Sequence, residues 1–466
     1  MRMQFVAAAL ALAFTGCAVG PNYKRPQVAV PDTHRGAPET TQPAASLADT
    51  KWDALFGDET LNKLIRTALE RNFDVRIAAE RVQQARAQLG VTRADQFPFV
   101  DGQAQFSAVR QSSLGSFRFL PVGTNLSATF TQLAAALSWE VDVWGRLRRL
   151  TESARARYLA SEEGRHAITI ALISDVTGAY FQLLEFELEL AISRKTREIA
   201  EDSLRLVQLR RDRGAASGLD ISQAEQLIYT TAAQIEAVER GIGQTENLLS
   251  LLLGGTPSTQ PRGRSLERVP IPPDVPAGLP SALLERRPDI RAAEQNLIAA
   301  NAQIGAARAL YFPQISLTGL AGSQSRALTQ IASAPARIYT LAPNMLLPIF
   351  RAGQIRNQVR LSESQQRELL AAYEQSIYNG LREVSDALIG YSRTGAQRAE
   401  QERLVRALED TVRLSNLRYK GGLDSYLQVL DAQRNLFAGE LGLAQLRLAE
   451  RLSVVQLYRA LGGGWQ

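Results

Sequence analysis

The protein is poor in side chains that bind metals or form cross-links, since its 466 residues include one cysteine, Cys17, and two histidines, His34 and His166. One cysteine and two histidines are too few for a disulfide framework, a CxxC redox pair or a zinc site of cysteines and histidines. The sequence also lacks GxSxG, HExxH and P-loop motifs. The carboxylates Glu140 and Asp142 would need a substrate pocket to act as acid and base, and nothing around them in the sequence supplies one. We therefore expect neither an enzyme nor a bound cofactor or metal.

Long apolar runs are also scarce. Residues 5–14 form the one run that precedes the cysteine, and no later stretch reaches the roughly 18 to 20 uninterrupted apolar residues that a membrane-spanning helix requires. If the chain crosses a bilayer, it therefore does so as strands.

The N-terminus resembles a bacterial lipoprotein signal. Arg2 provides the positive region, residues 5–14 provide the apolar region, and Thr15-Gly16 are the small residues before Cys17. We expect residues 1–16 to be a signal peptide and Cys17 to carry the lipid, and a lipidated and acylated cysteine gives stable anchoring. The absence of aspartate after the cysteine resembles lipoproteins that are sorted to the outer membrane. In an exported chain, the net charge of +6 does not indicate nucleic-acid binding.

The mature chain divides into an arm and a duplicated body. Proline recurs through residues 17–56, which predicts an extended, lipid-anchored arm. Beyond it, residues 68–98 align with 283–313, and Phe-Pro ends both segments. We expect a first repeat at 57–255, a proline-rich linker at 256–282 and a second repeat at 283–466.

Both repeats show the same order of periodicities. Segments 69–96 and 288–311 have a helical composition, and each is followed by Phe-Pro, which stops a helix. Apolar and polar residues then alternate within about 97–143 and about 312–350. This alternation predicts a hairpin of two amphipathic strands in each repeat.

Long proline-free segments follow the strands. Residues 145–213 and 351–420 each predict a helix of roughly 100 Å, at about 1.5 Å per residue. A shorter helix follows each one after a glycine turn, so helices are expected throughout 145–253 and 351–461. The two shorter helices of a repeat together nearly match its long helix, which favours a wall of antiparallel helices of uniform length.

The expected strands, four per chain, cannot close a barrel, and open strand edges are excluded from hydrocarbon. Membrane insertion therefore requires oligomerisation, and three chains would supply twelve strands. Asp101, Gln103 and Gln105 would face a wet lumen, and the alternating apolar residues would face lipid. We expect a mainly α-helical fold with a membrane β part: a duplicated unit whose trimer forms a twelve-stranded β-barrel continuous with a twelve-helix periplasmic α-barrel. A soluble hairpin on a helical bundle explains the alternation, but neither the lipoprotein signal nor the helix lengths.

Three motifs stand in a fixed order along the body: LSWEVDVWGR at 137–146, RPDIR at 287–291 and PIFRAG at 348–353. Together with two Arg-x-x-x-Gly-x-x-Ser turns, they resemble the TolC-like outer membrane factor family, in particular its NodT-type branch of efflux lipoproteins. The resemblance implies a homotrimer anchored by lipid in the outer membrane and extending into the periplasm, with the linker in its equatorial region. It also implies a passive gated duct for small toxic compounds, a periplasmic adaptor, and an inner-membrane transporter of the RND type.

The resemblance assigns roles to the two turns. Glycine permits a positive φ there, and serine can cap the following helix. In a trimer each carboxylate near the turns would form a ring that attracts cations, although solvated charge or pairing with a helix dipole also explains such residues. The implied pore-constriction residues are Asp424, Asp431, Asp220 and Tyr419. The implied adaptor-contacting residues are Arg210, Gly214, Ser217, Leu219, Arg418, Gly422, Ser425 and Leu427.

Two other functions stay open from the residues alone. One is the outlet of a type I-like polypeptide secretion system, and the other is a lipid-anchored periplasmic coiled-coil scaffold without a pore. A scaffold has no need of strands with one polar face, so the alternation favours a pore. Because the chain has no nucleotide site, a partner would have to supply the direction of transport.

Overall fold

The computed structural model describes residues 18–37, 46–55, 57–112, 126–270 and 278–463. The chain divides into two compact units, and each takes segments from both repeats. Unit 1 comprises residues 1–26, 82–160 and 293–372, and unit 2 comprises residues 27–81, 161–292 and 373–466. The long helices α5 (Arg146–Asp212) and α9 (Gln354–Lys420) each contribute a part to both units.

The described residues of unit 1 contain one antiparallel sheet, made of β1 (Phe99–Arg110), β2 (Ser127–Val141), β3 (Gln314–Ser325) and β4 (Arg337–Leu346). The strands follow one another in chain order, so β1 and β4 form the edges. The hairpins of the two repeats join through β2 and β3, where Val141 lies opposite Ile315. A Cβ atom at Gly322 would lie 2.1 Å from the carbonyl oxygen of Leu133, so this close pairing requires glycine. The two expected hairpins are therefore confirmed, and the structure shows in addition that they join into one continuous sheet.

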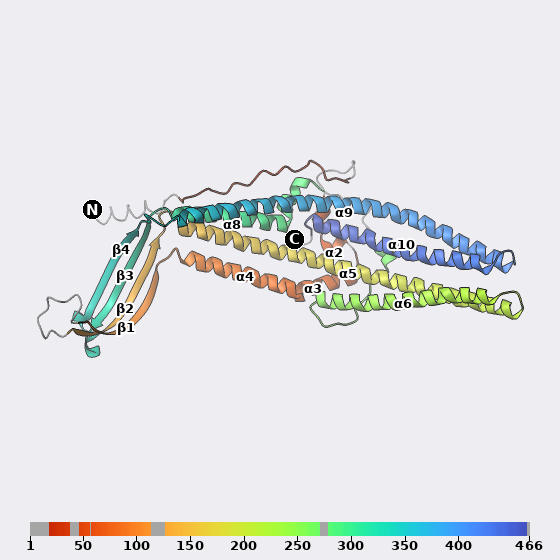
Figure 1. Ribbon diagram of the computed structural model, residues 1–466, viewed down its shortest axis with the longest axis horizontal. Coiled ribbons are helices and arrows are strands. Elements are labelled where there is room, and N and C mark those ends of the chain that lie inside the picture. Colours follow the sequence, from red (N-terminus) through yellow and green to blue (C-terminus); the bar gives the residue numbers. More distant parts are fainter. Residues whose placement is uncertain (1–17, 38–45, 56, 113–125, 271–277, 464–466) are drawn as a thin grey trace. The chain divides into compact units, whose positions relative to one another are not determined.

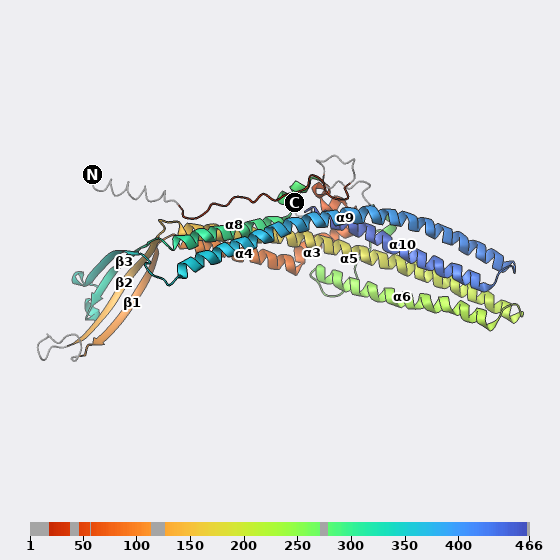
Figure 2. The same ribbon diagram turned by 45° about the horizontal axis from the view of Figure 1, so that its top comes forward.

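Aromatic packing fixes the change from strand to helix in unit 1. The ring of Trp144 stacks on that of Phe312 with 4.8 Å between centroids, and its indole nitrogen donates to the carbonyl oxygen of Pro313 at 2.8 Å. Gly145 then adopts a φ of 78°, which turns the chain into α5. Within the same unit, the C-terminal part of α8 (Pro288–Ala309) lies beside the start of α9 in both views (Figures 1 and 2).

Within the described part of unit 2, the long helices take part in two helical hairpins. The helix α6 (Gly218–Leu252) lies beside the second half of α5, and α10 (Tyr426–Ala460) lies beside the second half of α9 (Figure 1). Near the two turns the hairpins share an apolar core, in which Val207 of α5, Leu227 of α6 and Tyr419 of α9 are buried with Leu430 of α10. Packing of this core holds the two turns in a defined relation to each other.

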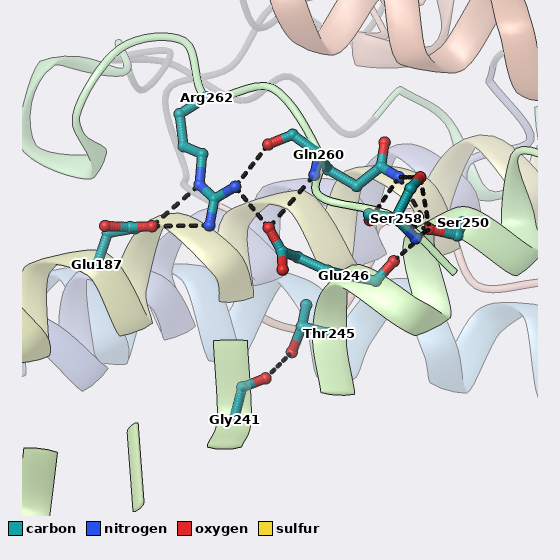
Figure 3. Close-up of polar contacts among 8 residues, drawn as sticks. All are labelled: Glu187, Gly241, Thr245, Glu246, Ser250, Ser258, Gln260 and Arg262. Atoms are coloured by element: carbon teal, nitrogen blue, oxygen red, sulfur yellow. Dashed lines mark hydrogen bonds and ion pairs between the residues drawn. The ribbon is translucent and has the colours of Figure 1, made fainter. Parts of the chain in front are cut away.

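The linker after α6 is fastened to α5 and α6 by polar contacts (Figure 3). The backbone nitrogen of Ser258 donates to the hydroxyl of Ser250 at 3.1 Å, and the amide of Gln260 donates to the same oxygen at 2.8 Å. Arg262 pairs with Glu187 of α5 at 2.9 Å and with Glu246 of α6 at 2.6 Å. The start of the proline-rich linker is therefore a bound segment of unit 2.

The expectation of one helix at 69–96 is wrong, because the chain breaks at Asn72. The helix α3 (Glu59–Arg71) ends there and α4 (Phe73–Ala94) begins. The Asn72 side chain accepts from the backbone nitrogens of Asp74 at 2.8 Å and Val75 at 3.2 Å, and donates to the carbonyl oxygen of Leu252 at 2.9 Å. Asparagine is a strong N-cap residue, and here it caps a new helix where neither proline nor glycine marks a break.

The other bounds differ from expectation by a few residues. The first long helix begins at Arg146 and the second at Gln354, and α8 ends at Ala309. One 18-residue window of α5 has the length and hydropathy of a membrane span, but 56% of it is buried inside the protein, as in a core helix. Short elements complete the described chain: η1 (Leu47–Asp49), α2 (Trp52–Leu55), η2 (Leu266–Arg268), η3 (Pro280–Ala282), α7 (Leu283–Arg286), η4 (Leu328–Gln330) and η5 (Ala334–Ala336).

Candidate functional site

The turn between α5 and α6 is closed by backbone and capping bonds. Gly214 has a φ of 73°, and the next backbone nitrogen, that of Ala215, donates to the carbonyl oxygen of Arg210 at 2.8 Å. The hydroxyl of Ser217 accepts from the backbone nitrogen of Asp220 at 3.2 Å, and the Asp220 carboxylate accepts from the backbone nitrogen of Ser217 at 2.7 Å. These reciprocal bonds form a capping box at the start of α6. Asp220 thus has a structural partner in its own turn.

The turn between α9 and α10 has the same backbone path but different side-chain contacts. Gly422 has a φ of 74°, and the Asp424 carboxylate accepts from Nε of Arg418 at 2.6 Å and from its Nη2 at 3.0 Å. The hydrogen bond from Arg418 holds the pKa of Asp424 below its usual value. Ser425 precedes α10, but its side chain makes no cap hydrogen bond, so the expectation that it caps this helix is wrong. Gln428 stands three residues after Ser425, where it could complete a capping box, but without the serine's cap hydrogen bond no capping box forms.

The two turns contact each other through one arginine. The guanidinium carbon of Arg210 lies 4.2 Å from the ring centroid of Tyr419, and its Nη2 donates to the carbonyl oxygen of Lys420 at 3.2 Å. Tyr419 is 5% exposed and packs edge-on against Tyr426, with 5.6 Å between centroids. Burial raises the pKa of Tyr426 to about 12. The structure therefore joins an expected adaptor-contacting residue to an expected gate residue.

The three carboxylates expected at the constriction each contact a residue of their own segment. Asp220 contacts Ser217, Asp424 contacts Arg418, and Asp431 accepts from Asn435 at 3.3 Å, one turn further along α10. A ring of these carboxylates would therefore have to combine the same residue from different copies of the chain.

Leucines expose apolar surface at both turns. Leu219 is 66% exposed and Leu427 is 49% exposed. Three more exposed leucines, which the sequence reasoning did not single out as site residues, are Leu209 (57%), Leu417 (59%) and Leu423 (71%). Their repetition beside the two arginines, as Leu209-Arg210 and Leu417-Arg418, is the signal that could have identified two of them.

The two carboxylates of the strand-to-helix junction, Glu140 and Asp142, accept hydrogen bonds from arginines. Arg146 donates to both oxygens of Glu140, at 2.9 and 2.7 Å, and Gln314 donates to one of them at 2.7 Å. Asp142 accepts from the backbone nitrogen of Arg148 at 2.8 Å. A cavity of about 400 Å³ adjoins this pair, so the expectation that nothing there supplies a pocket is wrong. The paired oxygens nevertheless serve to brace the junction.

A buried pair of glutamates on α5 was missed in the sequence. Glu185 is 2% exposed and Glu189 is 4% exposed, one helical turn apart. Gln182 donates to Glu185 at 2.9 Å, and Gln445 of α10 donates to Glu189 at 3.1 Å. Burial, with the hydrogen bond to Glu189, raises the pKa of Glu185 to about 8, so the protonated form of Glu185 is favoured at neutral pH. The run LLEFELEL at 183–190, in which charged residues interrupt an apolar helix, is the signal for such a pair.

The described residues contain no group of three or more histidine, cysteine, aspartate or glutamate side chains placed to hold a metal ion. The expected lipidation site, Cys17, and the expected signal peptide, 1–16, lie outside the residues that the structure describes.

The chain is similar in sequence and in structure to several known proteins. A family model described as outer membrane efflux protein matches residues 64–255 and 279–463. The solvent efflux pump outer membrane protein SrpC of Pseudomonas putida is 38% identical over 455 residues, 97% of this chain and 96% of that protein. The cation efflux system protein CusC of Escherichia coli is 36% identical over 462 residues, 98% of each chain. The open state of the Neisseria gonorrhoeae MtrE outer membrane channel matches with a TM-score of 0.86 and 31% identity, over 97% of this chain and 99% of that one.

Proposed function

The chain belongs to the outer membrane efflux protein family and is an outer-membrane efflux channel, and we propose that three copies of it form one duct. The observation that carries this proposal is the sheet β1–β4, whose edge strands present apolar side chains to the surroundings. Phe106 of β1 is 73% exposed and Tyr339 of β4 is 88% exposed. Four strands cannot close a barrel, whereas β4 of one copy paired with β1 of the next gives twelve strands in a ring.

The alternation along β1 supports a lumen and a lipid face. Val100 and Phe106 lie on one face of the strand, and Asp101, Gln103 and Gln105 lie on the other. In the closed barrel the apolar face contacts lipid, and the polar face lines a passage for solutes in water.

The turns serve as the partner-binding and closing end of the duct. The exposed leucines beside Arg210 and Arg418 offer a periplasmic adaptor an apolar surface with a basic rim. An inner-membrane transporter of the RND type drives transport through the adaptor, because the duct is passive. Since SrpC is named for solvent efflux and this chain has only 3 methionines, we place small toxic organic compounds ahead of copper or silver ions as cargo.

Carboxylate rings constrict the periplasmic end. Three-fold symmetry turns Asp424 and Asp431 into two rings of like charge, and the Arg418–Asp424 pair links the first ring to its own turn. Asp220 and Tyr419 assist by fixing the turns that carry these rings, through the capping box and the contact with Arg210.

The lipid anchor completes the proposal. Cys17 is acylated after removal of residues 1–16, and intact-mass spectrometry of protein purified from outer membranes tests this directly.

Single-channel conductance in planar bilayers tests the duct. The wild type should show a small cation-selective conductance, and Asp424→Ala combined with Asp431→Ala should raise the conductance and reduce the selectivity, because the rings lose their charge. Asp202→Ala, at an exposed carboxylate of α5, is the matched control and should leave both unchanged. If folded, inserted wild-type protein does not conduct, the duct is rejected in favour of an anchored scaffold; passage of an unfolded polypeptide but not of small solutes would favour secretion.

A further inference from the structure

The first described residues of the arm pack against α5 and α8 of unit 1. Residues 18–26 run along α8 in both views (Figures 1 and 2). The backbone nitrogen of Val19 donates to the carbonyl oxygen of Trp144 at 3.0 Å, and a Cβ atom at Gly145 would lie 2.8 Å from the Cα of Ala18. The arm therefore begins against the junction where β2 becomes α5.

Two glycines allow the arm to approach the helix backbone. Gly20 has a φ of 101°, and a Cβ atom on it would lie 2.4 Å from the Cα of Gly305 in α8. A Cβ atom on Gly305 would lie 2.7 Å from the carbonyl oxygen of Val19. Any larger side chain at either position would push the arm off the helix.

A buried arginine binds the arm by its backbone. Arg149 of α5 is 5% exposed, and its guanidinium lies 3.4 Å from each of the carbonyl oxygens of Val19 and Gly20. The same group donates to the side-chain oxygen of Asn22 at 2.7 Å. Arg149 also pairs through Nη1 with Glu152 of its own helix at 2.7 Å, so the arm supplies the acceptors for the other guanidinium nitrogens. These nitrogens would lose their partners if the arm left, which gives Arg149 a preference for the bound arm.

Two side chains of α8 fix the next residues of the arm. The amide of Asn301 donates to the carbonyl oxygen of Pro21 at 3.0 Å. The carboxylate of Glu294 accepts from Nε of Arg25 at 2.8 Å and from the hydroxyl of Tyr23 at 3.1 Å. With Arg149 and Gly305, these residues form what we call the arm groove.

We propose that the arm groove is a specific binding site for residues 18–26, and that it positions the lipid of Cys17 at the strand-to-helix junction and so sets the depth at which the sheet enters the membrane. The proposal rests on the proposed acylation of Cys17. Bound residues begin one residue after Cys17, and consecutive Cα atoms are about 3.8 Å apart, so a docked arm leaves the anchor little freedom to move away from the junction. An arm that merely tethered the protein would need none of these contacts.

Trypsin tests the binding site on full-length protein purified from outer membranes. Within the docked residues trypsin cleaves after Lys24, because Pro26 protects the bond after Arg25; cleavage after Arg35 and Lys51, further along the arm, is separated from it by the mass of the fragments. Arg149→Ala, Glu294→Gln and Asn22→Ala should each speed this cleavage about tenfold, because each removes a charge-assisted hydrogen bond that keeps the arm closed. Arg155→Ala, at an exposed arginine of the same helix, is the control and should match the wild type. Equal cleavage rates in all variants would overturn the arm groove. If Arg149→Ala does not fold, Asn22→Ala still tests the site, because Asn22 belongs to the arm and its loss leaves the folded body intact.

Membrane integration tests the positioning role on the same variants. Mass spectrometry first establishes that Cys17 is acylated equally in each. Arg149→Ala and Asn22→Ala should then show a severalfold smaller fraction of protein that resists urea extraction from outer membranes, whereas Arg155→Ala should not. If the variants are cleaved faster but resist urea extraction as well as the wild type does, the positioning role is overturned and the arm serves only as a tether. An unacylated wild-type Cys17 would overturn both the acylation and the positioning role, while the cleavage rates would still decide the binding site.

Discussion

Arg210 at the end of α5 lies over the ring of Tyr419 at the end of α9, with the guanidinium carbon 4.2 Å from the ring centroid. These residues are 209 positions apart in the chain (419 − 210), and each ends the long helix of its own repeat. The first repeat carries Arg211 at the position that corresponds to Tyr419, so the duplication supplies the cation from one repeat and the ring from the other.

Arg210→Ala and Tyr419→Leu should be coupled in thermal stability. A cation over an aromatic ring contributes about 0.5 to 1 kcal/mol at a partly exposed site, and leucine keeps the apolar packing while it removes the ring. A double-mutant cycle on unfolding, followed by circular dichroism in detergent, measures the coupling. Arg211→Ala with Tyr419→Leu is the control pair and should be additive; an additive result for Arg210 would contradict the interaction.

The two serines that precede α6 and α10 should differ in their effect on stability. Ser217→Ala should lower the free energy of unfolding by about 1 kcal/mol, because it removes a capping box. Ser425→Ala should change it by less than about 0.3 kcal/mol, since this side chain makes no cap hydrogen bond. Hydrogen exchange of the first turn of each helix reports the loss directly, and equal effects at both serines would contradict the difference between the turns.

Asn72→Ala should be more costly than either serine variant. It removes the cap of α4 and leaves the carbonyl oxygen of Leu252 without its donor, a loss of about 2 kcal/mol. Asn435→Ala, at an exposed asparagine of α10, is the comparison and should be nearly neutral in thermal unfolding. If both variants unfold at the wild-type temperature, Asn72 does not hold the break.

Stability should fall as the pH rises through the range set by Glu185. Its pKa is about 8 in the folded protein against an ordinary value of 4.5, because of burial and its bond to Glu189. Below pH 4.5 the folded and unfolded forms both hold the proton, so there is no penalty. Between pH 4.5 and about 8 the unfolded form loses it while the folded form keeps it, so unfolding becomes progressively easier, and above about 8 the penalty is constant.

Glu185→Gln should remove this pH dependence. Its melting temperature should exceed that of the wild type by more than about 3 °C at pH 8 and should equal it at pH 4. The groups that contact the Glu185–Glu189 pair from other helices are the amides of Gln234 and Gln445. Arg194, further along α5, forms its ion pair with Glu239 at 2.8 Å and not with either glutamate of the pair. Glu198→Gln, at an exposed glutamate of α5, should keep the wild-type profile. Parallel decline in Glu185→Gln and wild type would rule out Glu185 as the cause.

The fold was largely predictable because its signals are repeated and long. The duplication shows each periodicity twice, and Phe-Pro, Gly214 and Gly422 mark changes of direction that backbone sterics impose. The break at Asn72 was missed because the segment has a helical composition on both sides of a single asparagine, with no proline or glycine there to mark a change of direction. Asparagine favours N-cap positions, and the contact with Leu252 that adds to this one is visible only in the structure.

The site was predictable in its residues but not in their partners. Ser217 and Ser425 occupy matching positions, and each is followed three residues later by a side chain that can complete a capping box, Asp220 and Gln428. The sequence therefore did not reveal that only Ser217 makes the cap hydrogen bond. The contact of Arg210 with Tyr419 and the burial of Glu185 depend on packing between helices that are distant in the chain. Local periodicity carries no information about such contacts.

The pairing of β2 with β3 joins the two repeats within one sheet, so a single chain brings two hairpins that are already paired. A chain with only one repeat would bring a single hairpin, and a ring of twelve strands would need six chains to meet. The covalent duplication makes half of these joints intramolecular, where the effective concentration of one hairpin for the other does not depend on dilution. The equilibrium amount of the proposed three-chain ring therefore scales with the third power of chain concentration, whereas that of a six-chain ring would scale with the sixth, so the duplication favours assembly when chains are dilute.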